Sequence, residues 1–308
     1  MQGFSAGTMA DQQGKSVLVT GANSGLGFAA ALAFAAKGAA VTLGCRNMER
    51  GRAALEGIRS TTGTTTATLA ELDLASLDSV RAFAAGWDGP LDILVNNAGL
   101  MAPPRSTTVD GFEQQLGINH LGHFALSGLL LPALRRAPAA RVVVVSSIAH
   151  RRGVINFDDL MSQSRYRRWQ AYSQSKIANL YFAMEFARRL YEHGENIIVA
   201  AAHPGVANTN LPASMGRDPL ALITGAVMRL TAQPGSTAVL PVLYAAAAAD
   251  VRGGDFYGPS GLYGAAAGGV SIEAPAARVA DHLVALRLWE VSEALTQVHF
   301  ADLPPVGG

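Results

Sequence analysis

A tyrosine and a lysine stand four residues apart in the segment Tyr172-Ser173-Gln174-Ser175-Lys176. Two residues at this spacing lie on the same face of a helix. A nearby ammonium group stabilises a phenolate, so Lys176 is expected to lower the pKa of Tyr172 from its usual value of about 10. Tyr172 would then be a usable general acid or base for a hydroxyl or carbonyl group. The chain has only three lysines, so the pair is unexpected by chance.

Two hydroxyl groups follow a strongly apolar segment of the chain. The valine-rich run Arg141–Ser146 is typical of a buried strand, and Ser147 comes directly after it. In an open parallel sheet, ligands bind outside the carboxyl ends of the strands. Ser147 is therefore a candidate to contact a substrate, with Ser146 as the alternative if the strand ends one residue earlier.

A glycine-rich turn, with Gly21, Gly25 and Gly27, lies between a predicted strand and a predicted helix. Glycine permits a positive φ and a close approach of the backbone to a pyrophosphate, which helix N-terminal N–H groups can bind. Strand before and helix after are the context that this mechanism requires. The alternative is an ordinary turn whose helix is capped by Ser24.

The elements that must position these groups follow two alternating patterns. Short apolar runs predict strands at Ser16–Thr20, Ala40–Leu43, Thr65–Leu69, Leu91–Val95, Arg141–Ser146 and Asn196–Ala201. Longer alanine-rich stretches predict helices at Leu26–Lys37, Met48–Ser60, Leu77–Ala85, Gly111–Leu134 and Ala171–Tyr191. The alternation predicts an α/β fold, a single Rossmann-like doubly wound parallel sheet with helices on both faces. A further short strand is expected around Asp255–Tyr257.

The glycine spacing, Gly-x-x-x-Gly-x-Gly, resembles the TGxxxGxG turn of the short-chain dehydrogenase/reductase family. The resemblance runs from about Lys15 to about Val298. It implies a nicotinamide cofactor, and it assigns the turn to cofactor binding through Gly21, Asn23, Ser24, Gly25, Leu26 and Gly27.

The same resemblance assigns four catalytic positions. Tyr172 and Lys176 match the family's tyrosine and lysine, which also contact the cofactor, and Ser147 matches the serine that hydrogen-bonds the substrate oxygen. Asn119 lies in an N-x-x-G-x-F segment, where the family's asparagine holds a helix distortion and a water that links the lysine to solvent. The neighbouring His120 and His123 lack a third ligand at zinc spacing, so no metal site is expected.

Three further motifs are expected to line the cofactor. By resemblance Asp73 and Leu74 contact the adenine ring, although Asp73 could instead cap the helix that begins near Leu77. The family's NNAG motif is matched by Asn97, Ala98 and Gly99, where the amides could equally tie neighbouring strands together. The motif that borders the nicotinamide is matched by Pro204, Gly205, Val206 and Thr209.

Arg46 indicates which dinucleotide is bound. An NAD site needs a carboxylate at the end of the second strand, and the first acid here is Glu49. A guanidinium at Arg46 suits a 2′-phosphate instead. The sequence therefore predicts NADP (NADPH) rather than NAD, with a solvated arginine as the alternative. Cys45 is expected to be a small buried side chain beside the site.

Two variable segments are expected to build the substrate pocket. The residues 150–169 lengthen the separation of Ser147 from Tyr172 and most resemble an insertion of the retinol-dehydrogenase-like branch. A flap at about 206–232 is rich in apolar residues. These residues favour a lipophilic small-molecule substrate, or they form an ordinary amphipathic helix.

Composition limits the remaining classes. The 308 residues carry a net charge of +1, are 49% hydrophobic and 15% charged, and contain one cysteine. This excludes a disordered chain and a disulfide framework, and a net charge of +1 gives no electrostatic reason to expect binding to nucleic acid. No signal peptide or membrane span is expected, which predicts a cytoplasmic protein. We expect one domain over residues 14–300, with tails at 1–13 and 301–308, the first of them flexible.

The sequence thus predicts an NADP-dependent oxidoreductase that transfers a hydride between the nicotinamide and a carbonyl or alcohol of a lipophilic molecule. An alternative is an enzyme with tightly held NAD(P) that catalyses an epimerisation or elimination. A nucleotide-sensing regulatory protein is a further alternative. A homodimer or homotetramer is also expected, because the outer faces of the predicted helices 111–134 and 171–191 would otherwise be exposed.

Overall fold

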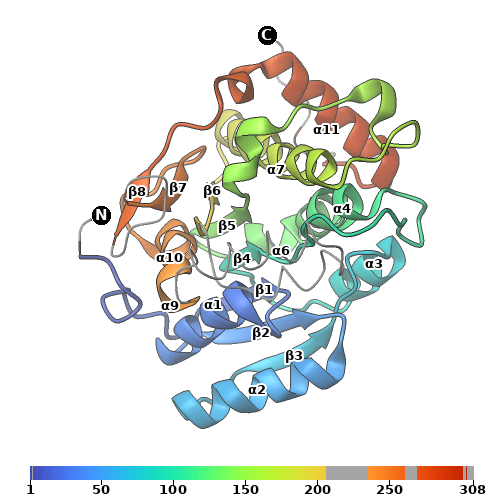
Figure 1. The fold of residues 1–308 in the computed structure, drawn as a ribbon. Helices are drawn as coiled ribbons and strands as arrows, with labels where there is room; N and C mark the ends of the chain where they lie inside the picture. Colours follow the sequence, from blue (N-terminus) through green and yellow to red (C-terminus); the bar gives the residue numbers. More distant parts are fainter. Residues whose placement is uncertain (2, 206–234, 261–268, 301–302, 304–308) are drawn as a thin grey trace.

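The computed structural model describes residues 1, 3–205, 235–260, 269–300 and 303. Its eight-stranded sheet has the order β3-β2-β1-β4-β5-β6-β7-β8 (Figure 1). The strands are β1 (Ser16–Thr20), β2 (Ala40–Cys45), β3 (Thr68–Glu71), β4 (Ile93–Asn96), β5 (Ala140–Val145), β6 (Ile197–Ala202), β7 (Phe256–Pro259) and β8 (Val270–Ile272). All neighbours pair in parallel except β7 and β8. The order reverses between β1 and β4, so the predicted doubly wound fold is confirmed.

Helices cover both faces of this sheet. The longer ones are α1 (Gly25–Ala36), α2 (Met48–Thr62), α3 (Leu77–Ala85), α5 (Gly122–Leu129), α7 (Arg168–Glu192), α10 (Leu240–Ala247) and α11 (His282–Thr296). Two buried clusters result, and β1 contributes Leu18 to one and Val17 and Val19 to the other. Because both faces are buried, the strands are apolar at successive positions rather than at alternate ones.

The predicted single helix 111–134 is wrong. The chain forms a short turn of helix, α4 (Gln114–Leu116), a π-helical turn at Gly117–Leu121, then α5, and it restarts as α6 (Leu131–Arg135). Pro132 stands at the start of α6, where a missing N–H costs nothing. The π-helical turn surrounds Asn119, as the resemblance implied.

Two other boundaries differ from the prediction. The predicted strand 65–69 begins later, at β3, because Thr64 and Thr66 hydrogen-bond each other in the turn before it. Strand β8, which pairs antiparallel with β7, was not predicted, since only three residues form it.

The described residues before Gly14, which were expected to form a flexible tail, contact the domain in the structure. Met9 is buried in the cluster under α1 and α10, and Phe4 packs edge-on against Tyr244, with ring centroids 4.9 Å apart. The Lys37 ammonium donates to the carbonyl of Gly7. This segment therefore belongs to the packed domain. Of the expected C-terminal tail, Leu303 is described, and it is buried.

The outer faces of α5 and α7 are covered within the chain, contrary to the reason given for an oligomer. Helix α11 packs against both helices, beside α7 (Figure 1). Its Trp289 contacts the rings of Phe124 on α5 and Phe186 on α7, and Phe300 packs against both of these rings. The oligomeric state stays a prediction.

Among the described residues, none of the helices combines the length and the apolar character needed to cross a membrane.

Candidate active site

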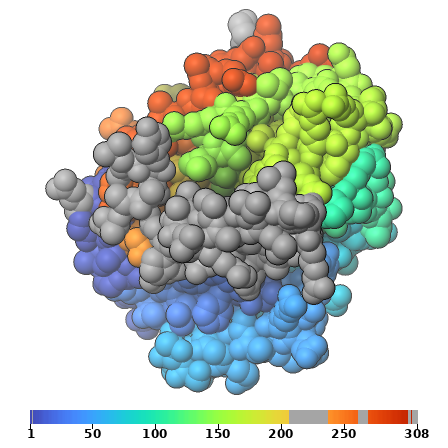
Figure 2. Space-filling view, viewed as in Figure 1, coloured from blue at the N-terminus to red at the C-terminus, as the bar shows by residue number. Residues whose placement is uncertain are grey.

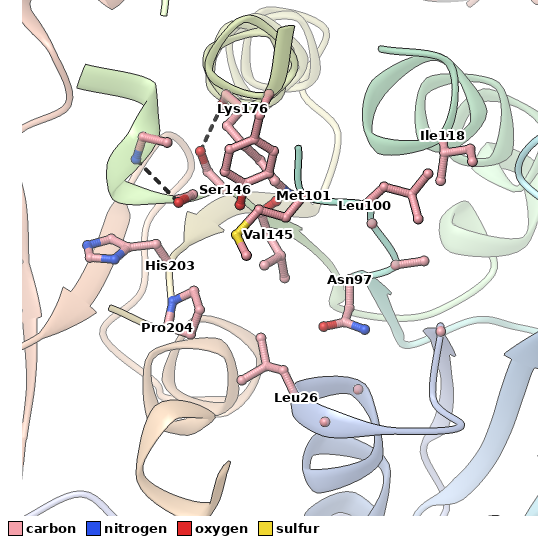
Figure 3. Close-up of a pocket in the computed structure, with 18 of the residues that line it drawn as sticks. Leu26, Asn97, Leu100, Met101, Ile118, Val145, Ser146, Lys176, His203 and Pro204 are labelled. Atoms are coloured by element: carbon pink, nitrogen blue, oxygen red, sulfur yellow. Dashed lines mark hydrogen bonds between the residues drawn. The ribbon is translucent and has the colours of Figure 1, made fainter. Parts of the chain in front are cut away.

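A cavity of about 1820 Å³ lies at the carboxyl ends of the parallel strands. Loops after β1, β2, β4, β5 and β6 all contribute to its lining. Leu26 at the start of α1, Asn97 after β4, Lys176 on α7 and Pro204 after β6 surround one space in Figure 3. The cavity thus joins the predicted cofactor residues to the predicted catalytic residues.

The glycine turn is shaped to admit a ligand to the N-terminus of α1. Gly21 and Gly25 have φ angles of +66° and +56°, which favour glycine. A Cβ atom on Gly27 would overlap the Asn97 amide and the carbonyl of Gly21. The side chain of Ser24 makes no capping hydrogen bond, so the alternative of an ordinary capped turn is not supported. The N–H groups of a 12-residue helix therefore face the cavity, which fits a pyrophosphate.

The NNAG segment ties the glycine turn to β4. The Asn97 side chain donates to the carbonyl of Thr20 at 2.7 Å, and the Thr20 hydroxyl accepts from the N–H groups of Asn97 and Ala98 at 2.9 Å. Asn97, Ala98 and Gly99 line the cavity as well. The amide of Asn97 therefore has the strand-tying role, while the segment still borders the cofactor space.

Arg46 and a second arginine, Arg50, stand together at one end of the cavity. Both line it and both are exposed. Asn47, the N-cap of α2, accepts from the N–H of Arg50 at 2.9 Å. This holds the first turn of α2 beside the end of β2. Arg50 was missed by the sequence analysis, although its place in the first turn of the helix predicted directly after Arg46 is a signal that could have found it.

Asp73 does not cap the next helix. The N-cap of α3 is Ser76, whose side chain accepts from the N–H of Ser79. The Asp73 carboxylate accepts from the N–H of Ala75 at 3.0 Å, and both Asp73 and Leu74 line the cavity. The capping alternative is therefore wrong, and the adenine contact stays a prediction.

The two serines after β5 have different roles. The hydroxyl of Ser146 is buried and donates to the carbonyl of Lys176 at 2.8 Å, which fixes the strand to α7. Ser147 caps the following 3₁₀ turn (Ile148–Arg152), accepting from the N–H of Ala149 at 3.2 Å, and it lines the cavity together with Tyr172. The geometry therefore selects Ser147, not Ser146, as the partner of the tyrosine.

The expected effect of Lys176 on Tyr172 is not what the structure shows. Burial raises the pKa of the Tyr172 hydroxyl, and the hydrogen bond with Ser147 opposes this rise. Lys176 is also buried, which lowers its pKa to about 8. Its ammonium donates to the carbonyl of Val145 at 3.2 Å and lies 5.9 Å from the centroid of the tyrosine ring. Desolvation of the phenolate therefore dominates the pKa of Tyr172 in this arrangement.

Asn119 joins the loop after β4 to α7. Its Oδ1 accepts from the N–H of Leu100 at 2.8 Å, and its Nδ2 donates to the carbonyl of Leu100 and to the hydroxyl of Ser175. Asn119 is fully buried within the π-helical turn. These three bonds satisfy the side chain and hold the distortion in place beside the lysine.

The histidines of the same turn are engaged elsewhere. His120 is hydrogen-bonded to Ser292, and His123 bridges the carbonyl of Asn119 and the hydroxyl of Thr20. Burial lowers the pKa of His120 to about 3 and that of His123 to about 4, so both rings are neutral at pH 7. In the part of the chain that the structure describes, no three His, Cys, Asp or Glu side chains are grouped to hold a metal. Cys45 is buried, which raises its thiol pKa to about 11.

The nicotinamide motif is described in part. Pro204 and Gly205 line the cavity beside Val145 and Lys176. Val206, Thr209 and the expected flap at 206–232 lie outside the described residues.

Two lining residues, Met101 and Glu273, were missed by the sequence analysis, whereas Trp169 lies in the segment 150–169 that was expected to build the pocket. Trp169 packs edge-on against Tyr172, with centroids 6.0 Å apart, and with Met101 it forms a small apolar cluster around the tyrosine. Glu273, which follows β8, has no sequence signal.

Comparisons with known proteins agree with this arrangement. Residues 15–219 match the family model for short chain dehydrogenases. The human protein retinol dehydrogenase 13 is 42% identical over 292 residues, covering 92% of this chain and 84% of the relative. Mouse retinol dehydrogenase 14 is 39% identical over 305 residues, covering 92% of this chain and 86% of the relative.

Solved structures show the same similarity. One from Mycobacterium paratuberculosis is 41% identical, with a TM-score of 0.81 over 99% of this chain and 100% of its own. A short chain dehydrogenase from Shigella flexneri, complexed with NADP, is 25% identical, with a TM-score of 0.62 over 81% of this chain and 98% of its own.

The fold and the site define a dinucleotide-dependent oxidoreductase that acts on alcohol and carbonyl groups. The chain belongs to the short-chain dehydrogenase family, and its relatives place it in the retinol-dehydrogenase-like branch.

Proposed function

We propose that this enzyme uses NADP to interconvert a carbonyl and an alcohol on a lipophilic small molecule. The observation that carries the proposal is that Ser147 and Tyr172 line the same cavity as the glycine turn. Two hydroxyl groups at one point can bind one carbonyl oxygen, and the tyrosine can supply its proton.

The residues of the chain divide the work of reduction as follows. Ser147 orients the carbonyl oxygen, and the Tyr172 hydroxyl gives it a proton as the carbonyl carbon gains a hydride. The cofactor, when bound, supplies or accepts that hydride. In the reverse direction Tyr172 takes the proton back. Lys176, with a pKa of about 8, can hold or release a proton beside this site, and Asn119 fixes the helix that carries it.

The preference for NADP rests on Arg46 and Arg50. Both guanidinium groups border the cavity at the end of β2, where a carboxylate would otherwise select NAD. Neither arginine has an acidic partner among the described residues. Two free cations suit a phosphate ester, whose charge at neutral pH is close to −2.

The lipophilic substrate is supported by the apolar cluster of Met101, Ala102 and Trp169 around Tyr172. The relatives are named as retinol dehydrogenases, so a retinoid-like alcohol or aldehyde is the first substrate to test. A cytoplasmic location and a homodimer or homotetramer are further parts of the proposal.

The decisive experiment measures consumption of NADPH and NADH with retinal, with medium-chain aldehydes and with a small hydrophilic aldehyde. We expect turnover with NADPH and the lipophilic aldehydes, and its loss in Tyr172→Phe. A preference for NADH or for the hydrophilic aldehyde would contradict the corresponding part of the proposal. A purified protein that retains a non-exchanging dinucleotide would favour the epimerase or eliminase alternative.

A further inference from the structure

A histidine and a glutamate outside the catalytic group meet at the edge of the cavity. His203, directly after β6, is 1% exposed, and its Nε2 lies 3.0 Å from Oε1 of Glu273. Its other ring nitrogen, Nδ1, lies 3.0 Å from the backbone nitrogen of Gly205. Figure 3 shows His203 beside Pro204 on one side of the cavity.

These two contacts determine the tautomer of the ring. The backbone N–H of Gly205 can only donate, so Nδ1 must carry a lone pair. The proton of the neutral ring is then on Nε2, where the carboxylate of Glu273 accepts it. A hydrogen bond from His203 also lowers the pKa of Glu273, which keeps this group ionised. A second proton on Nδ1 would remove the acceptor for Gly205.

The bond to Gly205 holds an unusual backbone. Gly205 has a φ of +68°, and it stands in the turn that the family resemblance places beside the nicotinamide. Strand β7 leaves room for the pair by means of Gly258, where a Cβ atom would overlap both Glu273 and His203. Two consecutive hydrogen bonds thus link the carboxylate of Glu273 to the imidazole of His203, and this imidazole to the turn at Gly205.

The segment that carries Glu273 is also fixed to the loop that carries Ser147. Arg151, in the 3₁₀ turn after Ser147, pairs with Glu273 at 3.3 Å. His150 in the same turn donates from Nδ1 to the carbonyl of Ser147, and its Nε2 accepts from the N–H of Ala276. In Figure 2 this green part of the surface lies next to the orange-red C-terminal part.

We propose that Glu273 is a positioning residue, which fixes the His203 tautomer that holds the Pro204–Gly205 turn and joins this turn to the Ser147 loop. The inference rests on the proposed function in one respect, since it takes this turn as part of the cofactor site. The charged and titratable groups that face His203 from the packed elements are Glu273, Arg151 and His150.

The test compares Glu273→Ala, which removes the acceptor, with Glu273→Gln, which keeps an acceptor but removes the charge. A control is Glu290→Ala, an exposed carboxylate on α11. Two quantities are measured without turnover: the Kd for NADPH by fluorescence, and the tautomer of His203 by nitrogen NMR.

For the wild type we expect one tautomer, with the proton on Nε2. Glu273→Ala should let His203 populate both tautomers and should raise the Kd for NADPH by about tenfold. This is the usual scale for removing a buried hydrogen-bond partner. Glu273→Gln should keep the tautomer and most of the affinity, and Glu290→Ala should match the wild type.

An unchanged tautomer together with an unchanged Kd in Glu273→Ala would overturn the inference. If that variant does not fold, Glu273→Leu, which fills the same space without an acceptor, takes its place, and an unchanged tautomer with an unchanged Kd in that variant would overturn the inference. Failure of the proposed function looks different, because no carbonyl compound would be reduced while the binding and NMR results still followed Glu273.

Discussion

The two ends of the cavity are built in opposite ways. At the Arg46 end, the two arginines are exposed, Arg46 directly after β2 and Arg50 in the first turn of α2. At the Tyr172 end, the tyrosine and Lys176 are each 5% exposed, and Asn119 is fully buried with three hydrogen bonds. The first end offers charge, and the second offers fixed positions.

This difference follows from what each end is proposed to do, since the Arg46 end would recognise a phosphate and the Tyr172 end would transfer a proton. A phosphate can be recognised by mobile cations in water, where each exposed contact contributes about 0.2–1 kcal/mol. Proton transfer to one oxygen requires groups that are held within hydrogen-bond distance of it. The surrounding side chains must therefore be fixed by hydrogen bonds and packing. Substitutions at the Arg46 end should therefore change which cofactor binds, whereas those at the Tyr172 end should change the rate.

The sharpest test of the Tyr172 end is Tyr172→Phe. We expect kcat to fall by about 10²–10⁴, the range for loss of a general acid, while the Kd for NADPH changes only a few-fold. The ring and its packing with Trp169 remain in the variant. Steady-state kinetics and fluorescence titration measure the two quantities. If more than about a tenth of the activity survives, another group is the acid.

The Arg46 end is tested by Arg46→Asp. The substitution replaces an exposed attraction of about 0.2–1 kcal/mol with a repulsion of similar size, so the binding of NADPH should weaken by roughly 2- to 30-fold. NADH should bind as well as before or better, because the new carboxylate can accept from ribose hydroxyls. Steady-state kinetics with NADPH and with NADH compare the two effects. The control is Arg52→Ala, because Arg52 is an exposed arginine on α2 that does not line the cavity. Equal weakening of both cofactors would make Arg46 a structural residue.

The two ends also differ in how far the sequence predicted them. Gly21, Gly25, Gly27, Ser147 and Tyr172 stand in local motifs whose backbone requirements are visible in the order of residues, and the structure brings them to one cavity. The π-helical turn at Asn119 was implied by the family resemblance alone, and the contact of Glu273 with His203 was not predicted, because both depend on packing between distant segments. The pKa of Tyr172 was predicted in the wrong direction for the same reason, since helical spacing reports a neighbouring charge but not the burial of both groups.

Burial of the Tyr172 end should appear in the pH dependence of stability. The folded pKa of Lys176 is about 8, below the value of 10.5 for a free lysine. Between these values the unfolded chain binds the proton and the folded chain does not, so the free energy of unfolding rises with pH from about 8 to 10. The rise is at most about 3 kcal/mol.

Above pH 10 the raised pKa of Tyr172 acts in the opposite sense, because the folded state then keeps a proton that the unfolded chain loses. Urea unfolding at several pH values measures both trends. Lys176→Met should lack the rise between pH 8 and 10. An identical rise in that variant would assign it to other groups.

The smallest expected effect concerns Arg50, and it decides whether the phosphate is bound by Arg46 alone or by both arginines. Arg50 borders the same space as Arg46 from the first turn of α2, but it is exposed and long, so its contribution is reduced by solvent and by side-chain entropy. Arg50→Ala should therefore weaken NADPH by about two- to fivefold and leave NADH unchanged. Arg52→Ala, two residues further along the helix, controls for loss of a positive charge near the site. The double variant Arg46→Ala/Arg50→Ala then measures their coupling, because two arginines that grip one phosphate give non-additive losses, whereas independent surface charges give additive ones. A loss of NADH affinity equal to that of NADPH would show that Arg50 acts by stabilising the start of α2 and not through the phosphate.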